Sequence, residues 1–245
     1  MPFLPKENIY GHTKKLRYFL SEIQRLSAGR SDFVVLDYGC GNGAAVSQYL
    51  IQLGIRYYGV DFHPESINYA RQHFSTATAQ FLEAVPPGVV FDAIVYSDII
   101  EHLSDPAALL SRHRQCLAED GSIIGSVPNG YGPFENEKRL GKIIGIPLML
   151  SAAVKVKRAL VGSSVSSVPY NSDSGHIQFF TRVALTDLLE ASGYRIESFA
   201  NGAFVGAPGS ELILRGETVA RANTKVADFL PYWAVSTWYF TARRK

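Results

Sequence analysis

The sequence predicts an α/β protein built on a parallel, doubly wound sheet. Short apolar runs typical of buried strands alternate along the chain with segments whose apolar residues recur at helical spacing. A glycine-rich turn, DYGCGNG at residues 37–43, directly follows the first apolar run. The length of 245 residues suits one large domain, and a domain of this size buries a core that needs no disulfide.

The first half of the chain begins with a predicted helix at residues 11–28, whose apolar residues lie on one face and indicate packing on a larger body. The alternation of strands and helices starts after this helix. Strands are expected at residues 33–38, 56–61, 79–82 and 90–96. Helices are expected at residues 43–53 and 64–74. Pro64 favours the start of the second of these helices.

The second half of the chain continues the pattern and then interrupts it. The expected elements are a helix at 105–118, a strand at 122–127, a helix at 181–192, a strand at 194–200 and a last strand at 237–243. Asp105 and Thr181 are good N-caps for the two helices. Residues 130–175 are predicted to form an insert, and residues 201–231 are predicted to be irregular. We therefore expect a single domain over residues 1–245.

Composition and charge exclude several classes of protein. With 24 Lys and Arg against 22 Asp and Glu, the chain has no basic excess that would point to nucleic acid. The two cysteines, Cys40 and Cys116, make no disulfide framework, so we expect a reducing, cytoplasmic setting. The N-terminus lacks an apolar signal core, and no uncharged apolar run approaches the roughly 20 residues of a membrane span.

The glycine turn predicts a ligand at the carboxyl end of the first strand, where open α/β sheets bind ligands. The spacing Gly39-x-Gly41 also fits the dinucleotide fingerprint, but Asp37 stands at the strand tip and would repel a pyrophosphate. A ligand with a cationic group, such as S-adenosylmethionine, would be attracted. Asp61 ends the second strand about 20 residues later, where an acceptor of two ribose hydroxyls belongs. The alternatives are a dinucleotide oxidoreductase and a cofactor-binding protein without catalysis.

Four stretches together resemble the motifs of class I S-adenosylmethionine-dependent methyltransferases: VLDYGCGNG, YYGVDFHPESINYAR, FDAIVYSDIIEHLSDP and LAEDGSIIGSVPN. The motif pattern resembles above all that of the ubiquinone-biosynthesis O-methyltransferases. The resemblance implies a Rossmann-like, seven-stranded sheet of order 3-2-1-4-5-7-6, with strand seven antiparallel and helices on both faces. It also implies that S-adenosylmethionine is the cofactor. The cofactor-binding residues that it implies are Asp37, Gly39, Cys40, Gly41, Asp61, Phe62 and Ser97.

The segment SDIIEHL, after the fourth strand, carries the candidate catalytic residues. On a helical turn Asp98, Glu101 and His102 would face one side, and His102 suits a general base at neutral pH. The three residues resemble the E-x-x-E-H signature of the ubiquinone-biosynthesis enzymes, which implies a divalent metal such as Mg²⁺. Here Asp98 gives a shorter arm than glutamate. Packing of the turn without chemistry is the alternative. His176, in SDSGHIQFF, is a second catalytic candidate, for binding the acceptor or sharing the base role.

Residues 138–158 form a basic apolar stretch in which six Lys and Arg residues flank twelve uncharged positions. Such a run is too short to span a bilayer but suits a segment that lies in its interface. A lid over the active site, or a subunit contact, would explain the same pattern.

The expected partner is a small-molecule or lipid-linked acceptor, such as a quinone-pathway phenol or a polyprenyl-linked sugar. The protein would reach it in the cytoplasm or at the inner face of the membrane. Nucleic acid is not expected as a substrate, because the tetrapeptide N/D-P-P-Y/F that holds a flipped base is absent after the fourth strand.

Overall fold

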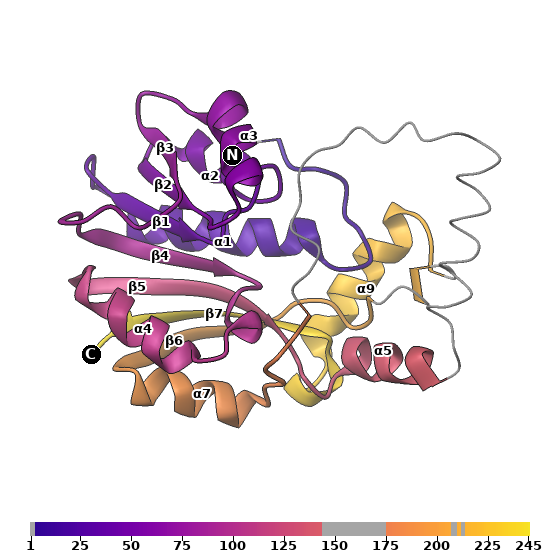
Figure 1. Cartoon of the computed structure of the whole chain (residues 1–245). Helices are drawn as coiled ribbons and strands as arrows, with labels where there is room; N and C mark the ends of the chain where they lie inside the picture. Colours follow the sequence, from indigo (N-terminus) through magenta and orange to yellow (C-terminus); the bar gives the residue numbers. More distant parts are fainter. Residues whose placement is uncertain (1–2, 144–174, 207–209, 212–213) are drawn as a thin grey trace.

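Seven strands form one sheet in the part of the chain that the computed structural model describes, residues 3–143, 175–206, 210–211 and 214–245 (Figure 1). Their order is β3-β2-β1-β4-β5-β7-β6. β7 runs antiparallel to β5 and β6, whereas the other pairs are parallel. The strands are β1 (Val34–Tyr38), β2 (Arg56–Val60), β3 (Ala79–Leu82), β4 (Phe91–Ser97), β5 (Leu117–Pro128), β6 (Tyr194–Asn201) and β7 (Thr237–Arg244). The predicted fold class and strand order are confirmed.

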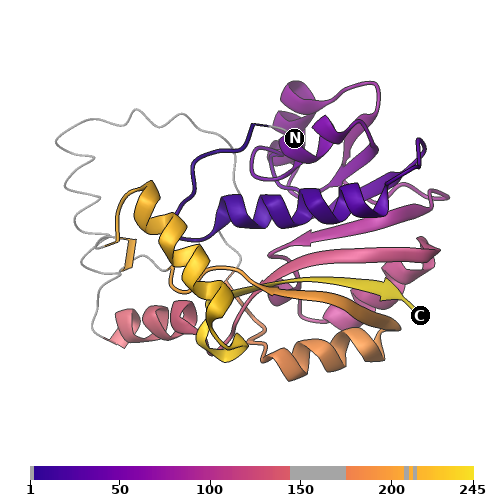
Figure 2. The same cartoon turned by 180° about the vertical axis from the view of Figure 1, so that it is seen from behind.

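Helices cover both faces of this sheet (Figure 1, Figure 2). The described α-helices are α1 (His12–Leu26), α2 (Ser47–Leu50), α3 (Pro64–Phe74), α4 (Pro106–Gln115), α5 (Pro133–Ile143), α7 (Arg182–Ala191) and α9 (Glu217–Phe229). Short 3₁₀ turns add η1 (Ile51–Leu53), η2 (Ile100–His102) and η3 (Tyr232–Ala234). α1, α2 and α3 pack on one face of the sheet, and α4 and α7 pack on the other.

Each face of the sheet has its own hydrophobic core. On α1, the fully buried residues Leu16, Phe19 and Ile23 recur at helical spacing and belong to the cluster on one face. On the opposite face, Leu110 of α4 and Leu189 of α7 are fully buried. Burial of one such side chain contributes about 1.5–3 kcal/mol. The sheet is therefore fixed from both sides, and the loops at its carboxyl edge are left to form a site.

Two predicted helices differ from the structure at their ends. The helix expected at residues 43–53 begins only with α2, because residues 43–46 still belong to the glycine turn. The helix expected at residues 105–118 ends at Gln115. β5 then starts at Leu117, well before the expected strand, because a bulge lets its first residue pair with β4.

A helix, α9, lies within residues 201–231, which the sequence predicts to be irregular. The buried positions of α9 are alanine, asparagine and threonine, so no stripe of large apolar residues marks the helix in the sequence. The predicted insert, residues 130–175, contributes α5, and its residues 144–174 lie outside the described part of the chain. Among the described residues, every helix is too short or too polar to cross a bilayer.

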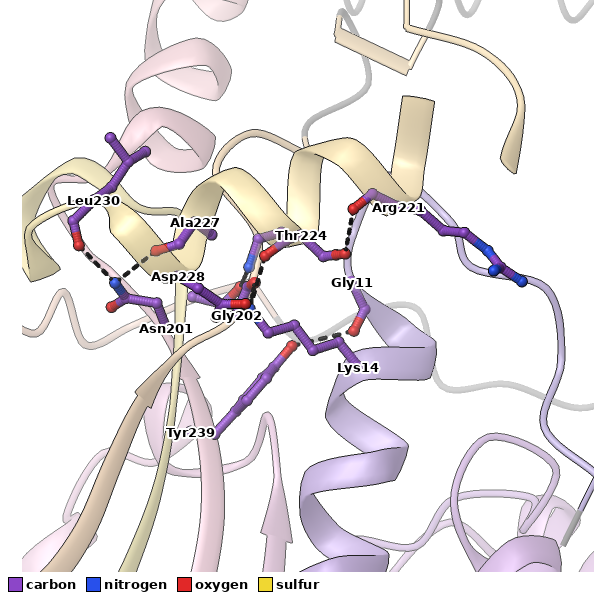
Figure 3. A network of polar contacts seen from close by, with 12 residues as sticks. Gly11, Lys14, Asn201, Gly202, Arg221, Thr224, Ala227, Asp228, Leu230 and Tyr239 are labelled. Atoms are coloured by element: carbon purple, nitrogen blue, oxygen red, sulfur yellow. Dashed lines mark hydrogen bonds and ion pairs between the residues drawn. The ribbon is translucent and has the colours of Figure 1, made fainter. Parts of the chain in front are cut away.

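α9 holds the first turn of α1 in place through the side chain of Lys14 (Figure 3). The Lys14 ammonium donates to the carbonyl oxygens of Gly202, at 3.0 Å, and Thr224, at 2.8 Å. It also forms an ion pair with Asp228, with 2.5 Å between Nζ and Oδ1. The first turn of α1, which also carries His12 and Lys15, is thereby fixed at the edge of the sheet.

Candidate active site

A cavity of about 1140 Å³ opens at the carboxyl ends of β1, β2 and β4. The predicted cofactor-binding residues all line it: Asp37, Gly39, Cys40, Gly41, Asp61, Phe62 and Ser97. The predicted catalytic and metal-binding residues line it as well: Asp98, Glu101, His102 and His176. The structure thus brings every predicted site residue into one space, at the edge of the sheet where α/β proteins bind ligands.

The glycine turn lets a ligand approach the backbone. Gly39, Gly41 and Gly43 have positive φ angles of 77°, 56° and 78°, a conformation that other residues adopt only at a cost. A Cβ atom on Gly39 would lie 2.2 Å from Cδ1 of Ile99. The Gly39 N–H donates to the carbonyl oxygen of Val60 at 2.7 Å, which holds the turn against β2. Ile99 fills the space beside Gly39, whereas a Cβ on Gly41 would meet nothing within 4 Å, so the cavity wall is bare backbone at Gly41.

Asp37 is a buried carboxylate with one oxygen unpaired. Its Oδ2 accepts hydrogen bonds from the Tyr57 hydroxyl, at 2.6 Å, and from the Ser47 hydroxyl, at 3.1 Å. Its Oδ1 is buried and has no hydrogen-bond partner among the described residues. Burial raises the pKa of Asp37 to about 6. A carboxylate in this state favours a ligand that brings a positive charge or N–H donors to Oδ1.

Asp61 lies at the tip of β2 and binds the glycine turn. Its Oδ2 accepts from the Gly41 N–H at 2.8 Å, and its Oδ1 accepts from the His63 N–H at 2.9 Å. The next side chain, Phe62, is 78% exposed at the cavity. Each Asp61 oxygen still has lone pairs available, because a carboxylate accepts about four hydrogen bonds.

Asp98 follows β4 and is bound to α1. It is the one non-glycine residue with positive φ, 56°, in the described part of the chain. Its Oδ1 accepts from the Ser126 hydroxyl at 2.6 Å, and its Oδ2 lies 2.5 Å from Nζ of Lys15. Burial opposes ionisation of Asp98, but the Lys15 ammonium outweighs it and lowers the pKa of the carboxyl. Asp98 is therefore ionised, and its charge is shared with Lys15.

His102 and His176 form a pair of neighbouring rings, with 4.9 Å between their centroids. Nδ1 of His102 lies 3.2 Å from the carbonyl oxygen of Gly175, to which it donates. Nδ1 of His176 lies 2.6 Å from Oε1 of Glu135. Burial lowers the pKa of His102, so this imidazole is neutral at pH 7. A neutral imidazole has a free lone pair, which is what a general base requires.

Glu101 lies beside the histidine pair and is fully buried. Neither of its carboxyl oxygens has a hydrogen-bond partner among the described residues. Burial, reinforced by the charge of Asp98, raises the pKa of Glu101 well above its usual range. Ligand atoms of Glu101, His102 and His176 lie within 4.8 Å of one another, whereas the predicted metal set has Asp98 in place of His176.

Two residues of the site have no signal in the sequence. Lys15 lines the cavity from α1, and Glu135 of α5 lies behind His176, a cavity residue, with its carboxylate against Nδ1 of that ring. A third residue, His12, also lines the cavity. Burial lowers the pKa of His12 to about 4. None of the three belongs to a motif, because each comes from an element outside the alternating core of the fold.

Comparison with known proteins places the chain among methyltransferases. A family model described as a methyltransferase domain matches residues 10–198. The ubiquinone biosynthesis O-methyltransferase of Cereibacter sphaeroides is 33% identical over 104 residues, which cover 39% of this chain and 41% of that protein. The protein of the same name from Xanthomonas campestris is 32% identical over 104 residues, which cover 39% and 43%. The chain spans about two fifths of the length of these curated relatives.

Solved structures share the fold at low sequence identity. An S-adenosylmethionine-dependent methyltransferase from Mesorhizobium loti aligns with a TM-score of 0.56 and 15% identity, over 91% of this chain and 96% of that one. The magnesium protoporphyrin IX methyltransferase ChlM of Synechocystis, with bound SAH, aligns with a TM-score of 0.53 and 15% identity, over 98% and 90%. Likeness at this level of identity concerns the fold alone.

Proposed function

Because the chain belongs to the methyltransferase domain family, we propose that it transfers a methyl group from S-adenosylmethionine to a hydroxyl group of a small-molecule or lipid-linked acceptor. One observation carries the proposal. A single cavity joins a buried carboxylate with an unpaired oxygen, at the glycine turn, to a pair of histidines beside the end of β4. The first feature suits a cationic cofactor, and the second suits removal of a proton from the acceptor.

The cofactor half of the proposal assigns three residues. Oδ1 of Asp37 faces positive charge on the methionine part, which would remove the cost of leaving that oxygen unpaired. Asp61 accepts hydrogen bonds from the two ribose hydroxyls, which its position at the tip of β2 supports. The bare backbone at Gly41 lets the body of the cofactor lie against the turn.

The acceptor half concerns a proton. As the hydroxyl oxygen bonds to the methyl carbon and the carbon–sulfur bond breaks, the hydroxyl must lose its proton. His102 and His176 line the cavity and present the imidazole groups that can take this proton. The walls of the cavity hold the two reactants together, which supplies a large part of the rate enhancement in reactions of this kind.

The predicted Mg²⁺ gains no support from the side chains present. Mg²⁺ prefers oxygen ligands in octahedral geometry. Here Asp98 is paired with Lys15, and the closely spaced group consists of two imidazoles and one buried carboxyl. Two imidazoles and a carboxylate suit a transition metal better. No step of the proposed reaction passes through a metal, and we expect activity to survive treatment with a chelator.

The nature of the acceptor rests on two weaker observations. The names of the curated relatives point to a hydroxylated acceptor of the quinone type. The basic apolar stretch at residues 138–158 suits contact with anionic lipid from the cytoplasmic side. Lys155, Lys157 and Arg158 lie outside the described residues. Replacing all three with glutamate should abolish co-sedimentation with anionic vesicles at low salt. If the unaltered protein stays in the supernatant at low salt, the lipid-linked acceptor loses its main support.

Calorimetry separates this function from that of a dinucleotide oxidoreductase. We expect S-adenosylmethionine and its demethylated product to bind in the micromolar range, and NAD to show no binding. Incubation with cell extract and methyl-labelled cofactor, followed by mass spectrometry of the small molecules, would then identify the acceptor. Tight binding of NAD would overturn the proposed function. Binding of S-adenosylmethionine without transfer to any metabolite would indicate a cofactor-binding protein instead.

A further inference from the structure

Glu135 and His176 form a pair that no sequence motif predicts. Glu135 is 3% exposed and lies on α5, and its Oε1 is 2.6 Å from Nδ1 of His176. An ionised carboxylate can only accept a hydrogen bond. Nδ1 of His176 therefore carries the hydrogen, and the lone pair of the neutral ring is on Nε2.

We propose that Glu135 is a positioning residue for the methyl transfer: it holds His176 as the Nδ1–H tautomer, with the lone pair of Nε2 available in the cavity, so that His176 rather than His102 takes the acceptor proton. This inference rests on the proposed function. It goes beyond that function because it distinguishes between the two histidines and assigns a role to a residue of α5.

The partners of the two rings differ in charge. Nδ1 of His102 donates to a neutral carbonyl, that of Gly175, at 3.2 Å. Nδ1 of His176 donates to a carboxylate at 2.6 Å. When a ring takes up a proton it becomes a cation, and a hydrogen bond between a cation and an anion is about twice as strong as a neutral one. The same logic explains the carboxylate behind the histidine of hydrolytic triads. A carboxylate therefore lies against the ring of His176, where positive charge would develop, whereas a neutral carbonyl lies against the ring of His102.

The two glutamates beside the histidine pair differ in their partners. Burial opposes ionisation of Glu135, but the hydrogen bond from His176 and the charge of Lys138 outweigh it and lower the pKa of the carboxyl. Nζ of Lys138 lies 3.5 Å from the same Oε1. Glu101, next to His102, has no hydrogen bond to its carboxyl oxygens among the described residues, and its Oε1 lies 3.9 Å from Nε2 of His102. A carboxylate hydrogen-bonded to Nδ1 is thus found behind His176, whereas a peptide carbonyl takes that place behind His102.

In the proposed step the methyl carbon passes from sulfur to oxygen. The acceptor hydroxyl oxygen forms a bond to the methyl carbon, and the carbon–sulfur bond breaks with its electron pair kept by sulfur. The sulfonium becomes a neutral thioether. The hydroxyl proton passes to Nε2 of His176, and the resulting imidazolium later releases it to solvent.

His176 is also held by contacts that do not involve Glu135, which makes a test possible. The backbone N–H groups of Ile177 and Gln178 both donate to the carbonyl oxygen of Glu101 at 2.9 Å. The side chain of Gln178 donates to the carbonyl oxygen of Leu103 at 3.1 Å. The segment that carries His176 is therefore fixed beside η2 whatever residue occupies position 135.

The test uses Glu135→Leu, which removes the acceptor of the Nδ1 hydrogen bond. In protein labelled with ¹⁵N histidine and treated with chelator, the ¹⁵N shifts at high pH report the tautomer of each ring. His176→Ala identifies the signals of His176. We expect the Nδ1–H form in the unaltered protein and mainly the Nε2–H form in Glu135→Leu. We also expect kcat to fall by roughly 10²-fold, with KM for S-adenosylmethionine unchanged, as loss of a general base would cause.

Glu135→Gln keeps a hydrogen-bond acceptor but removes the charge, and it guards against a folding defect in the leucine variant. We expect Glu135→Gln to retain the Nδ1–H tautomer and to lose roughly tenfold in kcat. The matched control is Glu137→Gln, on the same helix, whose carboxylate accepts from the Ser210 N–H and should leave kcat within twofold. His102→Ala should cost less in kcat than His176→Ala.

The outcomes separate the two proposals. If His176 keeps the Nδ1–H form in Glu135→Leu, or if Glu135→Gln has unaltered kcat, then Glu135 does not position the ring, whatever the protein methylates. If the tautomer changes as expected but His176→Ala turns over at the unaltered rate, the proton acceptor has been misassigned. If neither the unaltered protein nor any variant transfers methyl groups while the tautomer changes as expected, the proposed function is wrong, and the contact between Glu135 and His176 has a structural role only.

Discussion

Replacing Asp37 with asparagine should stabilise the cofactor-free protein at neutral pH. Asp37 is 1% exposed, and burial raises the pKa of its carboxyl from 3.8 to about 6. Because the folded-state pKa lies above the unfolded one, the folded protein binds the proton more tightly, and stability is lost as pH rises from 3.8 through 6. The loss amounts to about 3 kcal/mol at pH 7.5 and to roughly half of that at pH 5. Asparagine avoids it, because its carbonyl oxygen can still accept from Tyr57 and Ser47.

Urea unfolding without cofactor, followed by tryptophan fluorescence at pH 7.5 and pH 5, measures this effect. Asp37→Asn should exceed the unaltered protein by up to about 3 kcal/mol at pH 7.5, and by roughly half as much at pH 5. The exposed Asp32→Asn is the control and should change the free energy of unfolding by less than about 0.5 kcal/mol at both values. The reasoning fails if Asp37→Asn is no more stable than the unaltered protein, or if its advantage does not depend on pH.

The same substitution should act in the opposite direction on cofactor binding. A charge-assisted hydrogen bond contributes about 1.5–3 kcal/mol. Calorimetry should therefore show Asp37→Asn binding S-adenosylmethionine roughly 10- to 150-fold more weakly at pH 7.5. A residue that lowers stability and raises affinity is typical of a functional site. If Asp37→Asn were more stable than the unaltered protein and bound S-adenosylmethionine with the same affinity, Asp37 would have no role in cofactor binding.

Three further substitutions follow from single contacts. Asp61→Ala should weaken the binding of S-adenosylmethionine by about 1.5–3 kcal/mol in calorimetry, and unchanged affinity would show that Asp61 does not bind the ribose. Gly39→Ala places a Cβ against Ile99 at positive φ, so the midpoint of thermal unfolding should fall and cofactor binding should be lost; an unchanged midpoint would contradict the geometry. Lys14→Met leaves two carbonyl oxygens and one carboxylate without their donor, and urea unfolding should show a loss of about 2 kcal/mol, with a loss below 0.5 kcal/mol refuting the role of this contact.

The sheet could be predicted from the sequence because its elements carry local signals. Each strand of the first half is an apolar run, and the turn after β1 needs glycine at three alternate positions with positive φ. Where the prediction was wrong, the local signal was weak or absent. α9 buries Ala220, Asn223 and Ala227, which give no apolar stripe. β5 begins at Leu117, which pairs with β4, and the residues AED that follow it lie in a bulge and carry the local pattern of a turn.

Apart from His176, the site residues that could be predicted lie at or after the carboxyl end of a strand. The carboxyl ends of parallel strands meet at one edge, so Asp37, Asp61 and Asp98 could be placed together from their positions alone. Their partners come from elements whose orientation no local pattern fixes. Lys15 faces the cavity because α1 crosses the sheet with its opposite side buried, and Glu135 lies behind His176 because α5 follows the end of β5.

The partners decide what the predicted residues do. Asp98 lies at the position of a metal ligand in the resembled signature, but Lys15 from α1 takes its charge. The two histidines are the same side chain in the same cavity, yet one is backed by a peptide carbonyl and the other by the carboxylate of Glu135. A motif therefore gives the type of chemistry available at the end of β4. Which atom performs it depends on contacts made by α1 and α5, and these contacts are where variants should change activity without changing the fold.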